Sequence, residues 1–469
     1  MAGFGFSSQP VTVPRIETKY RRIVTQIPPP QSAETLEALD KYESRAMHGQ
    51  LPVIWEYAKG FQVGDPWGNV WIDFTSTIFV ANAGHGNPRI IEGLAEMLGR
   101  PLLHSYTFPT RIRAEYLRRL IEVAPAQFEK AFLLSAGTEA TECGLKLMRM
   151  YGAARGKRRG GVLAFEGNWH GRTLGAQLLS DNSSQKSWIG FSDPNIHHLP
   201  FPYPWRTDAM RDPRTYFRRG LNELVSTTGI DPKHDLCGIM METFQGWGAV
   251  FYPPEFVQEV AAFAKENDLL LAFDEMQAGF GRTGELFGYI HYGVEPDLLC
   301  CGKGASSGFP LAVVLGSAGI MDLPEIGSMS STHSANPLAC AAGLANLQAL
   351  LEDGLVDNAR RLGEVFHSRL GELRSQHPAL IRCVLGKGLV AAVHFVTPGG
   401  DLLVETCTRI CEESMRRGLL VVHTGRESIK LAPPLCISKE ALLEGLQVFS
   451  EAVAASVPEE LARASGDGS

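Results

Sequence analysis

The chain has 469 residues, 44% of them hydrophobic and 20% charged, with a formal net charge of -7. A chain of this length exceeds the size at which one hydrophobic core usually stops growing, so two domains are expected. The acidic balance argues against nucleic acid or an anionic membrane as a partner. No apolar run approaches the roughly 18 residues that a membrane helix needs. The opening MAGFGFSSQP lacks a basic segment followed by an apolar one, so we expect no secretory signal.

The nine cysteines form no CxxC pair and their spacing is irregular. An odd, irregular set does not suit a disulfide framework. We therefore expect reduced, buried thiols in a cytoplasmic protein.

The first segments of the chain lie before the main periodic region. Residues 1 to about 30 end in IPPP and are expected to form an extended arm. A short helix is predicted in SAETLEALDKYESR, with Ser32 as its cap and Leu36, Leu39 and Tyr42 on one face. Next, IWEYAKGFQVGDPWGNVWIDFTS alternates apolar and polar residues about the turn GDPWGN, which predicts a hairpin or meander.

From about residue 85 short apolar runs alternate with helical periods. The expected strands are AFLLSAG, GVLAFEG, LCGIMMET, LLLAFDE, PDLLCCG and LAVVLGS. This alternation predicts an α/β domain with a mostly parallel sheet over residues 85–350. Residues 351–469 mix amphipathic helices with the strands GLVAAVHFV, LLVVHTG and SIKLAPP. They predict a second, smaller α+β domain, to which residues 1–84 add an N-terminal arm and part of the fold.

Ligands of open α/β sheets sit at the carboxyl ends of strands, and unusual polar residues gather there in this sequence. SAGTEATE follows the strand AFLLS, so a glycine turn opens a helix. Free N–H groups, the helix dipole and the Thr138 hydroxyl would make an anion pocket suited to phosphate. An ordinary capped helix is the plainer alternative. This glycine turn carries neither a Walker A pattern nor a GxGxxG fingerprint, so ATP and NAD are not supported.

Two further strand ends carry candidates. In FEGNWHGRT an aromatic ring, Trp169, would stack on a flat cofactor beside His170, although a core tryptophan next to a bonded histidine fits as well. LLLAFDEMQAGFGRTG is a very apolar strand that ends in Asp274 and Glu275. A carboxylate there is costly unless something cationic or protonated meets it. No histidine lies at the local spacing of a metal site, so metal binding is not favoured.

DLLCCGKGASSGFPLA places one lysine, Lys303, between two glycines after an apolar run. A lysine in a partly desolvated pocket has a lowered pKa and becomes a nucleophilic amine that can form an imine. A phosphate pocket, an aromatic stacker, a buried acid and this lysine together fit pyridoxal 5'-phosphate.

These motifs together resemble the class III (ω-) aminotransferases, which have the type I pyridoxal-phosphate-dependent transferase fold. The resemblance extends from about residue 40 to about 450 and rests on SAGTEA, NWHGRT, FDEMQAGFGRTG, CGKGASSGFPLA and STHSANPLA. It implies an α/β large domain with a mostly parallel sheet and a smaller α+β domain. It also implies that Lys303 holds the cofactor covalently and then moves a proton on the substrate. Asp274 matches the acid that keeps the pyridine nitrogen protonated.

The resemblance implies further roles. Ala136, Gly137 and Thr138 match the phosphate loop. Trp169 matches the residue that stacks on the ring, and Gln277 the residue that bonds its phenolic oxygen. The other implied contacts are Met276 on the ring face, His170 beside the cofactor, Glu242 near the cofactor and substrate, and Thr332 at the phosphate of the neighbouring subunit's cofactor. A homodimer with shared active sites is therefore expected.

Three positions depart from the family pattern. His333 replaces a phenylalanine, and Lys430 stands where enzymes that use glutamate have an arginine. Trp247 stands where 4-aminobutyrate enzymes have a glutamate that gates this arginine. Arginine grips a carboxylate with two bonds, whereas lysine is a point charge. The departures argue against a straightforward 4-aminobutyrate or ornithine aminotransferase, and Trp247 would offer an apolar or sugar-stacking wall.

The predicted activity is transfer of a primary, ω-type amino group between an amine and a keto acid or aldehyde. An amino sugar or aminoglycoside is one amine that Trp247, Trp169 and Lys430 suggest. One alternative is another fate of the same carbanion: epimerisation, elimination or decarboxylation. A second alternative, a non-catalytic binding or regulatory protein, would suit a chain that lacked Lys303 or Asp274, and both are present.

Overall fold

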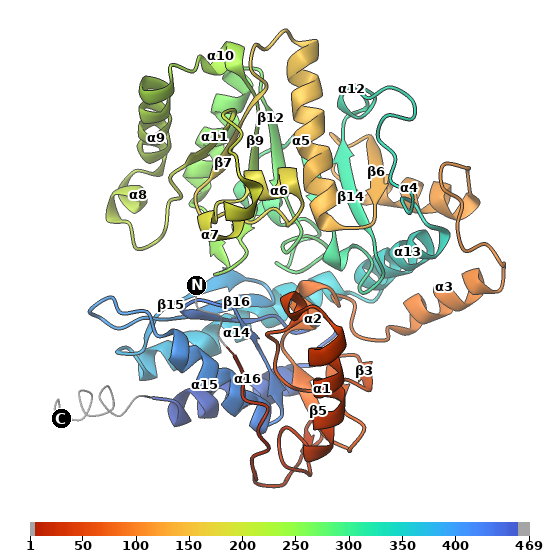
Figure 1. Ribbon diagram of the computed structural model, residues 1–469, viewed down its shortest axis with the longest axis vertical. Coiled ribbons are helices and arrows are strands. Elements are labelled where there is room, and N and C mark those ends of the chain that lie inside the picture. Colours follow the sequence, from red (N-terminus) through yellow and green to blue (C-terminus); the bar gives the residue numbers. More distant parts are fainter. Residues whose placement is uncertain (1–4, 458–469) are drawn as a thin grey trace. The chain divides into compact units, whose positions relative to one another are not determined.

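A computed structural model of the protein describes residues 5–457 (Figure 1). The chain divides into two compact units. Unit 1 contains residues 5–87, Trp247–Ala249 and 355–457, and unit 2 contains 88–246 and 250–354. We propose that residues 85–350 form the large domain. Residues 351–469 would form the small domain, to which residues 1–84 would add an N-terminal arm and a further part.

Unit 2 is built on a seven-stranded sheet in the order β6-β14-β13-β12-β9-β7-β8. Its strands are β6 (Lys130–Leu134), β7 (Gly161–Phe165), β8 (Ile196–Leu199), β9 (Leu236–Glu242), β12 (Leu270–Asp274), β13 (Leu298–Cys301) and β14 (Ala312–Gly316). The strands from β13 to β8 are parallel, and β14 is antiparallel to both of its neighbours. The central strands are buried throughout, as a sheet covered on both faces requires.

Helices cover this sheet. Those of unit 2 are α3 (Pro88–Leu98), α4 (Arg111–Val123), α5 (Gly137–Ala154), α6 (Leu174–Leu179), α7 (Ser183–Lys186), α8 (Thr207–Arg211), α9 (Pro213–Thr228), α10 (Pro232–Asp235), α11 (Pro254–Glu266), α12 (Ala318–Met321) and α13 (Pro337–Glu352). The long helix α5 lies along one face of the sheet, against β9, β13 and β14 (Figure 1). Its small residues permit this: a Cβ on Gly144 would lie 3.0 Å from Cys300 Sγ and 3.0 Å from Met240 Cε. α13 packs on α3 and α4.

The predicted mostly parallel sheet and its six expected strands are confirmed. The pattern missed β8, whose sequence IHHL has no alternation and only one buried residue. β8 lies at the end of the sheet order and pairs only with β7, so half-buried histidines are tolerated there.

Unit 1 contains two sheets. One has the strands β1 (Ile16–Glu17), β2 (Arg22–Ile23), β3 (Tyr57–Lys59), β4 (Gln62–Gly64), β5 (Val70–Asp73) and β17 (Leu419–Leu420). The other has β15 (Ile381–Lys387), β16 (Val390–Phe395), β18 (Val422–His423) and β19 (Ser428–Leu431). Antiparallel pairing of β3, β4 and β5 confirms the predicted meander. β15 was not predicted, because most of its residues are half-buried and give no periodic signal.

The helices of unit 1 are α1 (Ala33–Tyr42), α2 (Ser76–Phe79), α14 (Leu355–Gln376), α15 (Val404–Arg416) and α16 (Lys439–Ala455). The predicted first helix is present, and Ser32 is its N-cap residue, but Ser32 Oγ donates to Pro29 O instead of accepting from the helix. No residue of α1 is buried within this chain. Leu36 is half-buried, whereas Leu39 and Tyr42 are 43% and 79% exposed, so the apolar face predicted for α1 is only partly covered in the described chain.

α2 is a left-handed turn. Ser76, Thr77, Ile78 and Phe79 all have positive φ, between 46° and 69°. Each non-glycine residue in this conformation costs roughly 1–2 kcal/mol, so the surroundings must enforce it. Asp73 does so: its carboxylate accepts hydrogen bonds from Thr75 N (2.7 Å) and Ser76 N (3.0 Å), and it also bonds the buried ring of His85 at 2.7 Å.

Two general expectations can be compared with the described residues. All nine cysteines are free; seven are buried and Cys383 and Cys436 are half-buried, which agrees with the predicted reduced thiols. None of the helices between residues 5 and 457 combines the length and the apolar content that crossing a membrane requires.

Candidate active site

Three neighbouring strands of unit 2 end together at one edge of the sheet. Asp274, the last residue of β12, pairs in register with Glu242 at the end of β9 and with Cys300 on β13. Lys303 follows three residues after Cys300. Because the three strands are parallel, the two carboxylates and the lysine come to the same edge, as the sequence predicted.

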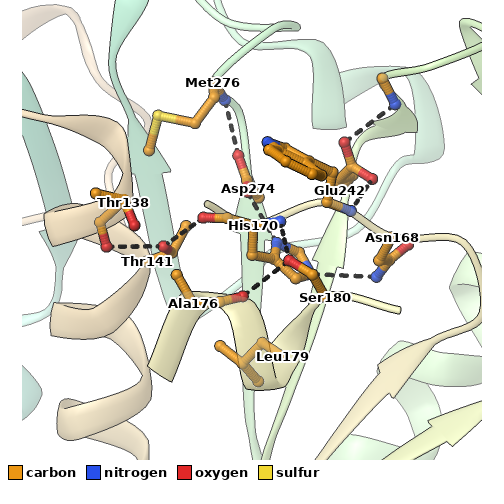
Figure 2. Close-up of polar contacts among 12 residues, drawn as sticks. Thr138, Thr141, Asn168, His170, Ala176, Leu179, Ser180, Glu242, Asp274 and Met276 are labelled. Carbon is orange, nitrogen blue, oxygen red and sulfur yellow. Dashed lines mark hydrogen bonds and ion pairs between the residues drawn. The ribbon is translucent and has the colours of Figure 1, made fainter. Parts of the chain in front are cut away.

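Asp274 is held by a buried hydrogen-bond network (Figure 2). Its Oδ1 accepts from Met276 N at 3.0 Å, and its Oδ2 lies 2.8 Å from Nδ1 of His170. Nε2 of this ring is 3.2 Å from Asn168 Nδ2, a donor. His170 therefore accepts at Nε2 and donates its Nδ1–H to Asp274.

The backbone of His170 is fixed as well. Its N–H donates to Ser180 Oγ at 2.8 Å, and its carbonyl accepts from the Thr141 hydroxyl at 2.7 Å (Figure 2). Ser180 in turn donates to Ala176 O at 2.8 Å. The imidazole behind Asp274 is thus set by helices α5 and α6, and only 2% of His170 is exposed.

Glu242 joins two loops of the site. Its Oε2 accepts from Trp169 N and its Oε1 from Gly246 N, each at 3.0 Å. The side chain is 4% exposed. Burial and the nearby Asp274 raise the pKa of Glu242 to about 8, against the influence of its two N–H donors and of Lys303. Near neutral pH this group therefore carries a proton for most of the time.

Lys303 starts a single 3₁₀ turn, Lys303–Ala305, with a left-handed φ of 45°. The residue is half-buried. Within residues 5–457 its amine has no hydrogen bond or ion pair, although Asp274 and Glu242 are close enough to interact with its charge. Desolvation lowers the pKa of Lys303, and these two carboxylates oppose it. An unengaged amine of lowered pKa is a nucleophile and a base.

The predicted phosphate loop is the start of α5. Ala136 is the N-cap residue, and Gly137 and Thr138 begin the helix, whose first N–H groups have no helical acceptor. Oγ1 of Thr138 lies 2.6 Å from Oγ1 of Thr173 and accepts from Thr173 N at 3.2 Å. Two hydroxyls thus flank a helix N-terminus, which is an arrangement suited to an anion.

Met276 lies between the phosphate loop and the lysine segment. A Cβ on Gly137 or on Gly302 would stand 2.7 Å from its sulfur, so both glycines make room for it. Gln277 packs on Gly246 just as closely, since a Cβ there would stand 1.9 Å from Nε2 of Gln277. These contacts explain why glycine stands at all three positions.

The remaining predicted residues lie elsewhere. Thr332 is exposed on unit 2, where its carbonyl is 2.8 Å from Nε2 of His104. Trp247 and Lys430 belong to unit 1. The Arg426 guanidinium stacks 3.7 Å above the Trp247 ring, and the Lys430 ammonium lies 4.5 Å above Phe79. The residues predicted for the cofactor thus all fall in unit 2, and the two predicted for the substrate fall in unit 1.

Sequence reasoning missed three supporting residues. Arg172 places its guanidinium 4.8 Å from the centre of the Trp169 ring. Asn168 and Thr173 bond His170 and Thr138, as described above. All three residues lie within NWHGRT, and the signal available for finding them was a polar residue next to a predicted contact.

The donor set fits pyridoxal phosphate. A free amine, a buried carboxylate with a histidine behind it, a half-buried indole and a hydroxyl-flanked helix N-terminus all lie in unit 2. The amine suits the aldehyde of pyridoxal phosphate, and the carboxylate suits its ring nitrogen. The indole suits the face of the ring, and the helix N-terminus suits the phosphate.

Comparison with known proteins agrees with this reading. The family model described as aminotransferase class-III matches residues 44–453. The 4-aminobutyrate aminotransferase of Mycobacterium leprae is 32% identical over 444 residues, which cover 92% of this chain and 97% of that protein. The alanine/serine racemase of Pyrococcus horikoshii is 31% identical over 462 residues, 96% of each chain.

Among solved structures, the ornithine aminotransferase of Toxoplasma gondii, with partial occupancy of pyridoxal phosphate at its active site, aligns with a TM-score of 0.81 and 26% identity. The alignment covers 92% of this chain and 96% of that one. It agrees with the predicted type I fold. With the family match over most of its length, the chain belongs to the class III aminotransferases and is a pyridoxal-phosphate-dependent enzyme.

Proposed function

We propose that this aminotransferase moves a primary, ω-type amino group from an amine to a keto acid or an aldehyde. The observation that carries the proposal is the half-buried amine of Lys303, which has no partner within residues 5–457 and feels the charges of Asp274 and Glu242. We further propose that the donor amine also carries a carboxylate. The relatives named for 4-aminobutyrate and ornithine support this proposal.

Bound pyridoxal phosphate supplies an aldehyde that exchanges amino groups and a ring that draws electrons from the substrate. Lys303 would hold this aldehyde covalently, would be released by the incoming amine, and would then take a proton from the carbon that bears the substrate nitrogen. Its lowered pKa keeps more of the amine unprotonated and able to accept that proton. The lysine would return the proton to a different carbon, and water would then cleave the new C=N bond, releasing the carbonyl product and leaving the amino group on the cofactor.

Asp274 holds a proton at the ring nitrogen, because a buried carboxylate stabilises a positive charge beside it. His170 donates to Asp274 and keeps it in place. The raised pKa of Glu242 keeps a second negative charge from competing for the same proton. The N-terminus of α5, with Thr138 and Thr173 beside it, would bind the phosphate, and Trp169 would stack on the ring.

The substrate carboxylate needs a cation. Arg172 is exposed on unit 2 with its guanidinium over Trp169, and Lys430 is a second candidate on unit 1. A guanidinium next to the stacking residue supports a role for Arg172 in binding a carboxylate or the acidic acceptor. Trp247, covered by Arg426, keeps an amino sugar among the donors to test.

We further propose a cytoplasmic homodimer to which Thr332 contributes. The exposed apolar side chains Leu103 and Phe108, 60% and 75% exposed, flank His104, which bonds Thr332. Exposed apolar side chains that gather in one segment, as they do in residues 102–108, are typical of an interface. Phe108→Glu should give monomers in sedimentation, whereas Phe191→Glu, an exposed aromatic elsewhere in unit 2, should leave the dimer intact. A wild-type monomer would contradict the proposal.

The central test is a panel of diamines, ω-amino acids and amino sugars added singly to the purified enzyme. The visible absorption of the bound cofactor should be lost with the true donor and restored by a keto acid. Racemisation, the activity named for the Pyrococcus relative, gives another result: the configuration of the substrate carbon inverts while the visible absorption of the cofactor persists. That outcome would replace transfer by the alternative carbanion chemistry.

A further inference from the structure

The segment that carries Lys303 is strained. Lys303 and Ser307 both have left-handed backbone, with φ of 45° and 53°, and neither is glycine. Ala305 N donates to Gly302 O at 3.0 Å, and the Ser306 hydroxyl donates to the carbonyl of Phe309. Strained residues of this kind persist only where the surrounding structure enforces their conformation.

One side chain from a distant helix supplies this enforcement. Asn346, on α13, donates from Nδ2 to Gly304 O at 2.8 Å and to Ala305 O at 3.0 Å. Its Oδ1 accepts from Ser307 Oγ at 2.6 Å. Both amide hydrogens and the carbonyl are therefore used, and all three bonds go to the four residues that follow Lys303.

Asn346 is unusual in its place. It is 0% exposed, and it is the only polar side chain among the buried residues of α13, which are otherwise alanine, leucine, cysteine, glycine and proline. Asparagine is a poor helix former, and a buried amide without partners is costly. A leucine at this position would suit the helix better, so the three bonds are the physical reason for the amide.

We propose that Asn346 is a positioning residue for the reaction, which fixes the turn after Lys303 so that its amine points at the cofactor aldehyde. The proposal rests on the role proposed above for Lys303. It concerns the geometry of the amine and not the stability of α13 alone. A displacement of about 1 Å at a reacting group can cost on the order of a hundredfold in rate.

The test measures covalent attachment, which is separate from turnover. Cofactor-free protein is mixed with excess pyridoxal phosphate, samples are reduced with borohydride at intervals, and the labelled Lys303 peptide is quantified by mass spectrometry. Asn346→Leu keeps the branched shape of the side chain and removes all three bonds, so attachment should slow by about tenfold or more. Ser307→Ala removes one bond and should slow attachment by a smaller factor.

Gln177→Leu is the matched control. Gln177 is also a buried amide on a helix that bonds a loop with both ends, through Gln185 O and Trp188 Nε1, but it does not touch the lysine segment. Its attachment rate should equal that of the wild type, whatever it does to the melting temperature.

Wild-type attachment rates in both Asn346→Leu and Ser307→Ala would overturn the proposal. If Asn346→Leu does not fold, Ser307→Ala alone decides between the two outcomes. Lys303→Ala separates this question from the proposed function: turnover that survives in Lys303→Ala refutes the role of the lysine, whereas loss of turnover there with unchanged attachment rates in the other variants refutes only the role of Asn346.

Discussion

Two lysines, the half-buried Lys303 and the buried Lys430, have different surroundings. Lys303, in unit 2, lies near the carboxylates Asp274 and Glu242, and its amine has no bonding partner within residues 5–457. Lys430, in unit 1, is 5% exposed and rests its ammonium on the face of Phe79. An aromatic face stabilises a cation as a cation, whereas desolvation without a bonded partner favours the neutral amine. We therefore expect the same residue type to serve chemistry in unit 2 and charge recognition in unit 1.

The largest expected difference between the two lysines is in turnover. Lys303→Ala should lower kcat by about a thousandfold or more, because it removes both the covalent anchor and the base. Lys430→Ala should retain covalent attachment of the cofactor. Steady-state rates with a saturating donor measure both. Comparable losses of kcat in the two variants would contradict the different roles proposed for Lys303 and Lys430.

A smaller loss is expected at the acid beside Lys303. Asp274→Asn removes the charge that holds a proton at the ring nitrogen, so kcat should fall by about 10²–10³. The matched control is Asp297→Asn, since Asp297 bonds Leu271 N near the opposite end of β12. Single-turnover absorption changes give the rate of the chemical step. An Asp274→Asn enzyme as fast as Asp297→Asn would remove Asp274 from the mechanism.

At Lys430 we expect an effect on binding. Lys430→Met keeps an unbranched side chain that is one atom shorter and removes its charge, so KM for an amine with a carboxylate should rise by about tenfold while kcat changes little. Lys430→Arg should restore the affinity. An equal rise for amines without a carboxylate would mean that the loss is one of packing.

The smallest predicted change is in the pH dependence of stability. Glu242 has a folded-state pKa of about 8 against an ordinary value of 4.5. Between these values the folded state holds a proton that the unfolded state has lost. Stability therefore falls as pH rises through this window, by up to about 1.4 kcal/mol per pH unit.

Glu242→Gln should flatten this slope when the cofactor-free protein is unfolded with urea from pH 5 to 8.5. The flattening should be partial, because burial raises the pKa of Glu275 to about 7 and this group acts in the same direction. A slope identical to that of the wild type would show that Glu242 is ionised in the folded protein.

Much of the sheet and the candidate site in unit 2 could be predicted from sequence. Apolar runs such as LLLAFDE identify buried strands, and the parallel arrangement brings Asp274, Glu242 and Lys303 to one edge. The contacts behind these residues could not be predicted. The bonds of His170 with Asn168 and Ser180, and of Asn346 with the lysine turn, depend on how α5, α6 and α13 pack. No local pattern encodes that packing.

The left-handed turn of α2 was also beyond prediction. No glycine marks residues 76–79 in the sequence, and the signal for their conformation is the carboxylate of Asp73 three residues earlier, which bonds backbone N–H groups. The sequence does not show which backbone N–H groups an aspartate will bond, so the three-dimensional structure is needed to identify this turn.

At this turn, the usual destabilising effect of glycine is expected to change sign. Glycine usually weakens an ordered segment, because it loses more backbone freedom on folding. At Thr77 and Ile78, with φ of 50° and 62°, glycine would instead relieve a cost that the folded chain now bears. A screen for thermostable forms of this enzyme should therefore include glycine at these two sites, where most design protocols would exclude it.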